Sequence, residues 1–102
     1  MKESTLVRKM VKHMRAQGAY ANKTHGNMYS SGIPDIVGCY RGVYLGLEAK
    51  VPGRENTVTE LQQAQLDKIE EAGGVSAVVT SIQDVDDALA EAEELMLGGE
   101  DD

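Results

Sequence analysis

Two short segments of the chain carry charged side chains at a spacing that suits phosphate chemistry. Gly32-Ile33-Pro34-Asp35 opens one apolar stretch, and Glu48-Ala49-Lys50 closes the next. Carboxylates can hold a divalent cation, and a lysine beside them can orient water or offset negative charge. The two segments therefore predict one compact site that acts on phosphate groups, provided that the fold brings them together.

A tight hairpin would bring them together. Both flanking stretches, residues 35–40 and 43–50, have the composition of β-strands, and Gly42 between them can take a positive φ. With Arg41-Gly42 as a two-residue loop, Asp35 lies directly opposite Glu48, with Cβ atoms about 4.5–5.5 Å apart. Lys50 shares the face of Glu48, because alternate residues of a strand point the same way. A three-residue loop would shift the register by one and undo the pairing.

The second strand has a clean apolar face opposite its charged one. Like charges that face each other across strands are destabilising, and a bound divalent cation would remove that cost. The alternative is an ordinary exposed hairpin with scattered charges. The face expected in the core consists of Ile36, Val43, Leu45, Leu47 and Ala49.

These residues resemble a known nuclease family. G-I-P-D followed by E-A-K, and then by Leu61-Gln62 ahead of Ala72-Gly73-Gly74, is similar to the PD-(D/E)xK nuclease superfamily. The resemblance is greatest to its small VRR-NUC branch, which is related to Holliday-junction resolvases, and it extends from Glu3 to about Leu97.

The resemblance implies a site and a cofactor. It implies Mg²⁺, for which Mn²⁺ would substitute, held by Asp35, Glu48, the backbone carbonyl of Ala49 and, through water, Glu3. It makes Asp35, Glu48, Lys50 and Gln62 the catalytic set, with Gln62 holding the water or the Lys50 amine. Lys50 would orient the water, help to deprotonate it, or offset charge in the transition state.

Pattern alone leaves two of these residues open. Glu3 projects onto the apolar stripe of the first helix, where a carboxylate needs a partner, unless Ser4 caps the helix and leaves Glu3 outside. Gln62 falls among apolar positions of the second helix with Val58, Leu61, Ile69 and Ala72, and would otherwise be an edge residue bonded to backbone. Cys39 is interpreted as small core filler.

The charge of the chain is divided unevenly. The net charge is −7, yet residues 1–58 hold nine Lys and Arg against four Asp and Glu, a balance of +5. Residues 59–102 carry −12. The half with the motif is thus basic, as a phosphate-binding surface requires. Arg8, Lys12 and Arg15 form a row on the first helix, opposite its apolar stripe. The residues predicted to contact DNA are Arg8, Lys12, Lys23, His25, Tyr29 and Arg54, each of which has an ordinary surface role as its alternative.

The pattern of elements predicts one small α/β domain over residues 1–97, with 98–102 as an acidic flexible tail. The expected order is α-β-β-β-α-β-α, a small mixed β-sheet flanked by helices, restriction-endonuclease-like by resemblance. A capping box at Thr57-Val58-Thr59-Glu60 should start the second helix. The expected elements span residues 3–17, 19–24, 35–40, 43–50, 57–73, 75–80 and 81–97.

Together these features predict a metal-dependent, structure-selective DNA endonuclease that acts at four-way (Holliday) junctions. The alternatives are a nick-, flap- or end-directed nuclease, or a non-cleaving DNA-binding module with a relic site. The resemblance implies a homodimer on branched DNA. We expect no membrane association, because no apolar run is long enough to span a bilayer. The single cysteine fits a reducing, cytoplasmic location, and the small chain suggests a phage or prophage origin.

Overall fold

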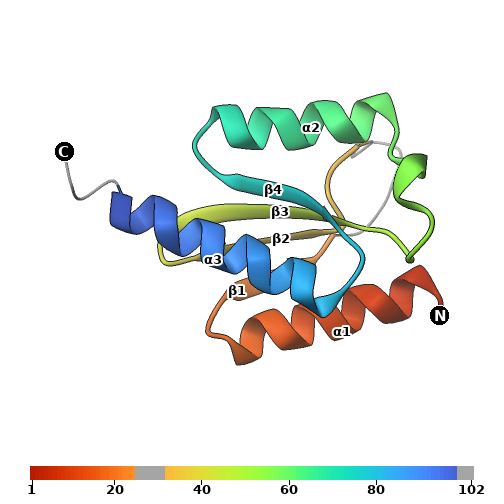
Figure 1. Ribbon diagram of the computed structural model, residues 1–102, viewed down its shortest axis with the longest axis horizontal. Coiled ribbons are helices and arrows are strands. Elements are labelled where there is room, and N and C mark those ends of the chain that lie inside the picture. The colour runs from red at the N-terminus through yellow and green to blue at the C-terminus, as the bar shows by residue number, and fades with distance from the viewer. Residues whose placement is uncertain (25–31, 99–102) are drawn as a thin grey trace.

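The structure is a computed structural model that describes residues 1–24 and 32–98. A mixed four-stranded sheet is flanked by three helices, and the expected order α-β-β-β-α-β-α is confirmed (Figure 1). The elements are α1 (Glu3–Ala16), β1 (Tyr20–Lys23), β2 (Ile36–Tyr40), β3 (Val43–Ala49), the 3-10 turn η1 (Glu55–Thr57), α2 (Glu60–Glu71), β4 (Val75–Val79) and α3 (Ile82–Gly98). Gly98 thus ends α3, and residues 99–102 of the expected tail lie outside the described residues.

The sheet has the strand order β1-β2-β3-β4. The first three strands are antiparallel neighbours, as short connections allow. Strand β4 runs parallel to β3, and α2 makes the crossover between them. The motif strands β2 and β3 therefore lie in the middle of the sheet.

The turn between β2 and β3 has the two-residue form that the sequence predicts. Arg41 and Gly42 have φ values of 55° and 82°, the left-handed pair of a type I′ turn. Tyr40 pairs with Val43, and at the far end Ile36 pairs with Leu47. The register that places Asp35 beside Glu48 is thereby confirmed.

One face of the sheet carries the main core. Helices α1 and α3 contact this face and each other, and Figure 1 shows them on the opposite side of the sheet from α2. The apolar stripe of α1 is buried here. On β3 the residues on this face are Leu45, Leu47 and Ala49, and the residues between them are buried as well, because α2 covers the other face. The buried members include Leu6, Val7, Met10, Val11, Met14, Ile36, Leu45, Leu47, Ala49, Val75, Val79, Val85 and Leu89.

Helix α2 contacts the other face over β3 and β4. It starts two residues later than predicted, with Thr59 as its N-cap, because the reciprocal capping box joins Thr59 to Gln62. The expected apolar arc is also wrong in part, since Leu61 and Ala72 are exposed and Leu66 is the buried residue. Leu66 and Ile69 face the sheet, where Ile69 lies against Gly46 of β3.

The prediction that Cys39 fills the core is wrong, because its side chain is exposed. Cys39 lies between Tyr20 of β1 and Tyr44 of β3 in the strand register, and both tyrosines are exposed, by 70% and 50%. These three residues share the face on which α2 has its main contacts with β3 and β4. Among the described elements, no helix has comparable contacts with β1 or β2 on this face.

Within residues 1–24 and 32–98, no helix has the length and apolar character needed to cross a membrane.

Candidate metal centre

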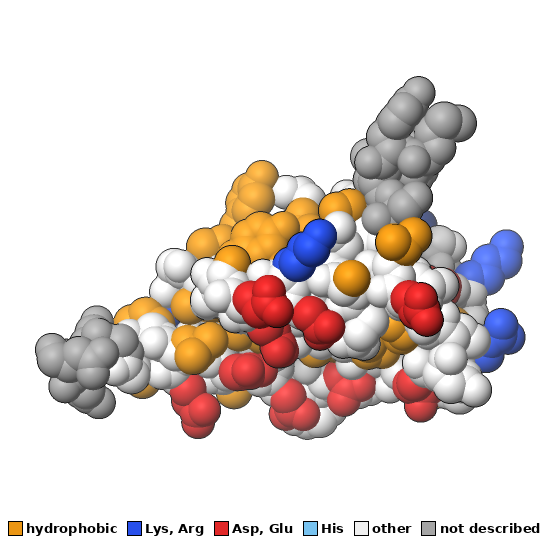
Figure 2. All heavy atoms as spheres, turned by 90° about the horizontal axis from the view of Figure 1, so that it is seen from above, with side chains coloured by type: hydrophobic (Ala, Val, Ile, Leu, Met, Phe, Trp, Pro, Cys, Tyr) orange, Lys and Arg blue, Asp and Glu red, His pale blue; other side chains and the backbone are white. Residues whose placement is uncertain are grey.

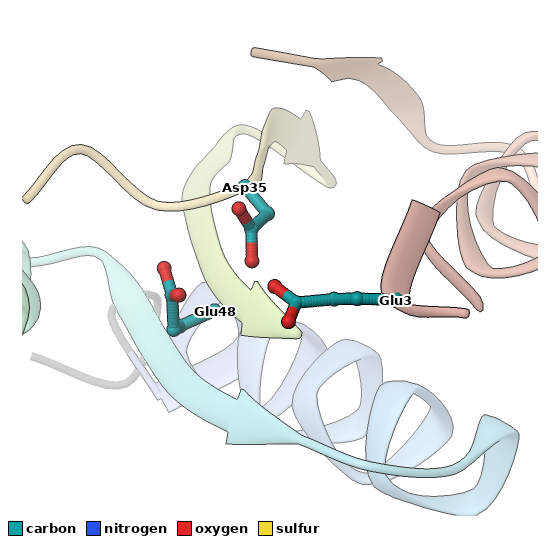
Figure 3. A group of neighbouring side chains, drawn as sticks. All are labelled: Glu3, Asp35 and Glu48. Carbon is teal, nitrogen blue, oxygen red and sulfur yellow. The ribbon is translucent and has the colours of Figure 1, made fainter. Parts of the chain in front are cut away.

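Three carboxylates from separate elements meet at one end of the sheet. Glu3 comes from the first turn of α1, Asp35 from the residue before β2, and Glu48 from β3. One oxygen from each lies within 4.8 Å of the others. Figure 3 shows the three side chains converging from different directions. The structure therefore brings together the carboxylates that the sequence analysis selected.

Asp35 is held in place by both its backbone and its side chain. Its carbonyl accepts a hydrogen bond of 2.8 Å from the Thr24 N–H, which ties it to the end of β1. Its Oδ2 accepts a hydrogen bond of 3.0 Å from the Ala49 N–H of β3. Thr24 also donates through Oγ1 to the Pro34 carbonyl at 2.8 Å. One oxygen of Asp35 is thus anchored to β3, and the other remains for a ligand. Sequence reasoning missed this role of Thr24, whose only signal was its place at a strand end.

Gly32 brings the motif segment against the start of α2. Its φ is 83°, and a Cβ there would lie 2.7 Å from the Leu61 carbonyl oxygen. A side chain at this position would collide with backbone, so glycine is required. The close contact fixes the path of the chain into Pro34 and Asp35.

Glu48 and Lys50 are both buried, which is unusual for charged residues. Their exposed fractions are 2% and 8%. The Lys50 ammonium lies 3.5 Å from Glu48 Oε2, and the Lys50 N–H donates to the Val79 carbonyl of β4 at 3.0 Å. Glu48 pairs with Val78 of β4 and Lys50 continues that pairing just beyond the end of β3, so the backbone of both residues is held in place.

The pKa of Glu48 is raised mainly by its burial. Burial, followed by the nearby Asp35 carboxylate, raises the pKa of Glu48 from its ordinary 4.5 to about 7, although Lys50 opposes the rise. A cation bound beside Glu48 would favour its ionised form.

The donor set fits a hard divalent cation. Carboxylate oxygens are the ligands that Mg²⁺ and Mn²⁺ take in proteins. Opposite oxygens around Mg²⁺ are about 4.2 Å apart, so a group that spans up to 4.8 Å needs a small contraction or one bridging water. The exposed Glu3 is the member best placed to act through water.

The backbone of Ala49 is directed toward the same site. Its N–H points to Asp35, and the N–H and C=O of one strand residue point toward the same neighbouring strand. The Ala49 carbonyl is therefore directed toward the edge where Asp35 stands, which is compatible with the ligand role implied by the resemblance.

Gln62 has a structural role in this arrangement. Its Oε1 accepts a hydrogen bond of 2.9 Å from the Thr59 N–H, and its own N–H donates to Thr59 Oγ1 at 3.1 Å. This matches the alternative of a glutamine bonded to backbone. A catalytic role for Gln62 stays a prediction.

The residues predicted to contact DNA fall in three places. Arg54 lines a pocket of about 340 Å³ together with Glu3, Met1, Val51 and Thr57, directly beside the carboxylates. Arg8, Lys12 and Lys23 line a second pocket with Val11 and Arg15. His25 and Tyr29 lie outside the described residues.

Comparison with known proteins assigns no identity to the chain. No protein-family model matches it, and a search of curated proteins finds no match.

Proposed function

We propose that this protein is a metal-dependent endonuclease that hydrolyses phosphodiester bonds in DNA. The observation that carries the proposal is the convergence of Glu3, Asp35 and Glu48 within 4.8 Å, with the Lys50 ammonium 3.5 Å from Glu48. Three carboxylates and a lysine from three separate segments of the sequence form a group that suits cation-assisted phosphate hydrolysis.

Asp35 and Glu48 are the direct ligands in this proposal, with the Ala49 carbonyl beside them and Glu3 acting through water. A divalent cation held there would polarise the phosphate and acidify the attacking water. Asp35 keeps its charge close to the cation while Ala49 anchors its other oxygen. Glu48 is fixed by the paired strand β3, so little rearrangement is needed on binding.

Lys50 acts on the water or on the developing charge of the phosphate. Its position two residues after Glu48 on the same strand face sets it beside the cation without direct contact. Because it is buried, water screens its charge weakly, and its effect on a nearby anion is strong. Arg54, in the pocket that Glu3 also lines, is placed to hold a neighbouring phosphate.

We expect the natural substrate to be branched DNA, and four-way junctions in particular. We also expect a homodimer, since two sites related by a two-fold axis suit paired cuts on opposing strands. The open part of the sheet, with exposed Tyr20 and Tyr44, offers an apolar surface for a second copy. Figure 2 shows hydrophobic side chains gathered beside the acidic surface on the α2 side of the molecule. The proposed site of action is the cytoplasm of a bacterial or infected cell.

The test is cleavage of labelled DNA with Mg²⁺, with Mn²⁺ and with EDTA. The substrates are a linear duplex, a nicked duplex, a flap, a splayed duplex and a four-way junction of matched sequence. The expected result is cation-dependent nicking of the junction on opposing strands by a species that light scattering shows to be dimeric. A monomer that cuts only flaps or ends would overturn the junction assignment. No cleavage of any substrate with either cation, by folded protein that binds DNA, would favour the relic binding module instead.

A further inference from the structure

A groove between α1 and β1 gathers cationic side chains. Its volume is about 300 Å³, and it is lined by Arg8, Val11, Lys12, Arg15 and Lys23. Val11 is buried and forms an apolar floor, while the four cations are exposed. Arg8, Lys12 and Arg15 occupy positions i, i+4 and i+7 of α1, so they follow one another along a single helix face.

The charges of this groove are not neutralised within the described part of the chain. The ion pairs there join His13 to Asp86, Arg41 to Glu93 and Lys50 to Glu48, and none involves a groove cation. Like charges three or four residues apart on a helix repel each other. A fold that retains four such cations around one concavity is suited to an anion that relieves the repulsion.

Arg15 is held in a defined orientation. Its Nε donates to the Ala21 carbonyl at 3.0 Å, and its Nη2 donates to Asn22 Oδ1 at 3.0 Å. Both partners belong to β1, and both are neutral. The guanidinium therefore keeps its full charge in a fixed place, so less entropy is lost when it binds an anion.

The groove runs along α1 away from the helix end that carries Glu3, and its row of cations projects from a different side of α1 than Glu3 does. Arg8 lies about 7.5 Å along the helix axis from Glu3, and Arg15 about 18 Å. On the other wall, Lys23 pairs with Ile36, the residue after Asp35. The row from Arg8 to Arg15 covers about 10 Å, which corresponds to about three phosphates of one strand at roughly 3.4 Å of axis each.

We propose that the α1–β1 groove binds the sugar-phosphate backbone of a nucleic acid strand. An elongated row of cations fits successive phosphates of a polymer better than one small anion. This inference shares the nucleic acid ligand of the proposed function but does not depend on cleavage. Arg15 was not among the residues predicted from the sequence to contact DNA, and in this proposal it binds the strand at the end of the groove farthest from Glu3.

The experiment measures binding of labelled 20-nucleotide single strands and duplexes in EDTA, over a range of salt concentrations. The variants Arg8→Ala, Lys12→Ala and Arg15→Ala should each weaken binding by about three- to tenfold. Each should lower the slope of log affinity against log salt by about 0.9 on duplex and about 0.7 on single strand, the effect of one lost phosphate contact. Lys9→Ala is the matched control, since Lys9 is exposed on the same helix but does not line the groove.

Arg15 donates hydrogen bonds to Ala21 and Asn22 of β1, so Arg15→Ala could disturb the fold. In that case Arg8→Ala and Lys12→Ala still test the groove. Groove variants that bind as well as Lys9→Ala would overturn the inference. So would complete competition by millimolar inorganic phosphate with no dependence on strand length, which would indicate a small-anion site.

The two proposals can fail separately. Groove-dependent binding by a protein that cuts nothing with Mg²⁺ or Mn²⁺ would support the groove and overturn the nuclease. Cation-dependent cleavage with unchanged DNA affinity in all three groove variants would support the nuclease and overturn the groove.

Discussion

The carboxylate centre and the α1–β1 groove both include side chains of α1, and they are built in opposite ways. The centre holds Glu48 on the inner strand β3 and Lys50 directly after it, both buried and both held against β4. The groove holds long cationic side chains on the outer face of α1 and on the edge strand β1, all exposed. In the centre, the side chains have fixed positions, so the loss of a single group can change a reaction rate greatly. In the groove, the side chains are long and hydrated, so each is expected to contribute a small and independent part of the binding affinity.

The most severe test of this contrast is Asp35→Asn. The asparagine oxygen can still accept the Ala49 hydrogen bond, so only the charge is lost. Cation stabilisation of phosphate is worth several kcal/mol, so we expect a loss in single-turnover cleavage rate of about 10³-fold or more. DNA affinity in EDTA should change less than about threefold, unlike that of the groove variants. The control Glu91→Gln removes an exposed carboxylate of α3. Cleavage at a near wild-type rate would refute the ligand assignment.

Lys50→Ala should separate rate from affinity most clearly. Loss of one positioned group that stabilises the transition state costs about 10²–10³-fold in rate. Metal binding, followed by calorimetry, and DNA binding should stay close to wild type. Lys68→Ala, an exposed lysine of α2, is the control. A large fall in affinity with unchanged chemistry would instead make Lys50 a phosphate anchor, like the groove residues.

The buried charge of Glu48 should appear in metal-free stability. Its pKa in the fold, about 7, lies above the ordinary 4.5, so the ionised form is disfavoured by folding. The contribution of Glu48 to the free energy of unfolding is therefore most favourable below pH 4.5, and it is lost as the pH rises through 7. In EDTA, Glu48→Gln should therefore melt at least about 4 °C higher than wild type at pH 8, with little difference at pH 4.5. Mg²⁺ should raise the wild-type melting temperature more than that of the variant. An equal difference at both pH values would contradict the shift.

Glu3→Ala should have an intermediate effect. A residue that acts on a metal through water typically contributes about 10–100-fold to affinity or activity. Its helix-dipole contribution to stability is only about 0.3–1 kcal/mol. Activity should therefore fall much more than the melting temperature. Glu60→Ala is the matched control, because it also removes an acidic residue from the first turn of a helix, in this case α2. Equal small effects in both would remove Glu3 from the centre.

Gln62 should give the smallest effect, and mainly on stability. Loss of its capping bond in Gln62→Ala costs about 1 kcal/mol. Gln62→Glu preserves a side-chain oxygen for the capping box. If Gln62 is only a cap, cleavage by both variants should match wild type once they are folded. A loss of activity in Gln62→Glu at unchanged stability would restore the catalytic prediction.

The strand pairing was the most predictable part of the molecule. A two-residue turn and an alternating apolar face are both local, and together they place Asp35 beside Glu48. The start of α2 was missed by two residues, because Thr57 and Thr59 offer equivalent capping residues and only the bonds to Gln62 distinguish them.

Features that depend on how elements pack were less accessible. The exposure of Cys39 depends on how far α2 extends across the sheet, which no local pattern encodes. The bonds from Arg15 to β1 likewise depend on how α1 lies against its neighbour. The basic row on α1 was visible in the sequence, but the groove beside it was not.

The Arg41-Gly42 turn also determines on which face of the sheet each carboxylate of the centre lies. Side chains alternate along a strand, so the length of this loop determines whether Asp35 and Glu48 lie on one face or on opposite faces. One inserted residue that left the loop at two residues would keep every side chain of the centre and a paired hairpin, yet put the two carboxylates on opposite faces. The register of two strands can shift only by whole residues, so the two carboxylates either share a face or do not. The turn that determines this lies at the far end of the sheet from the carboxylates.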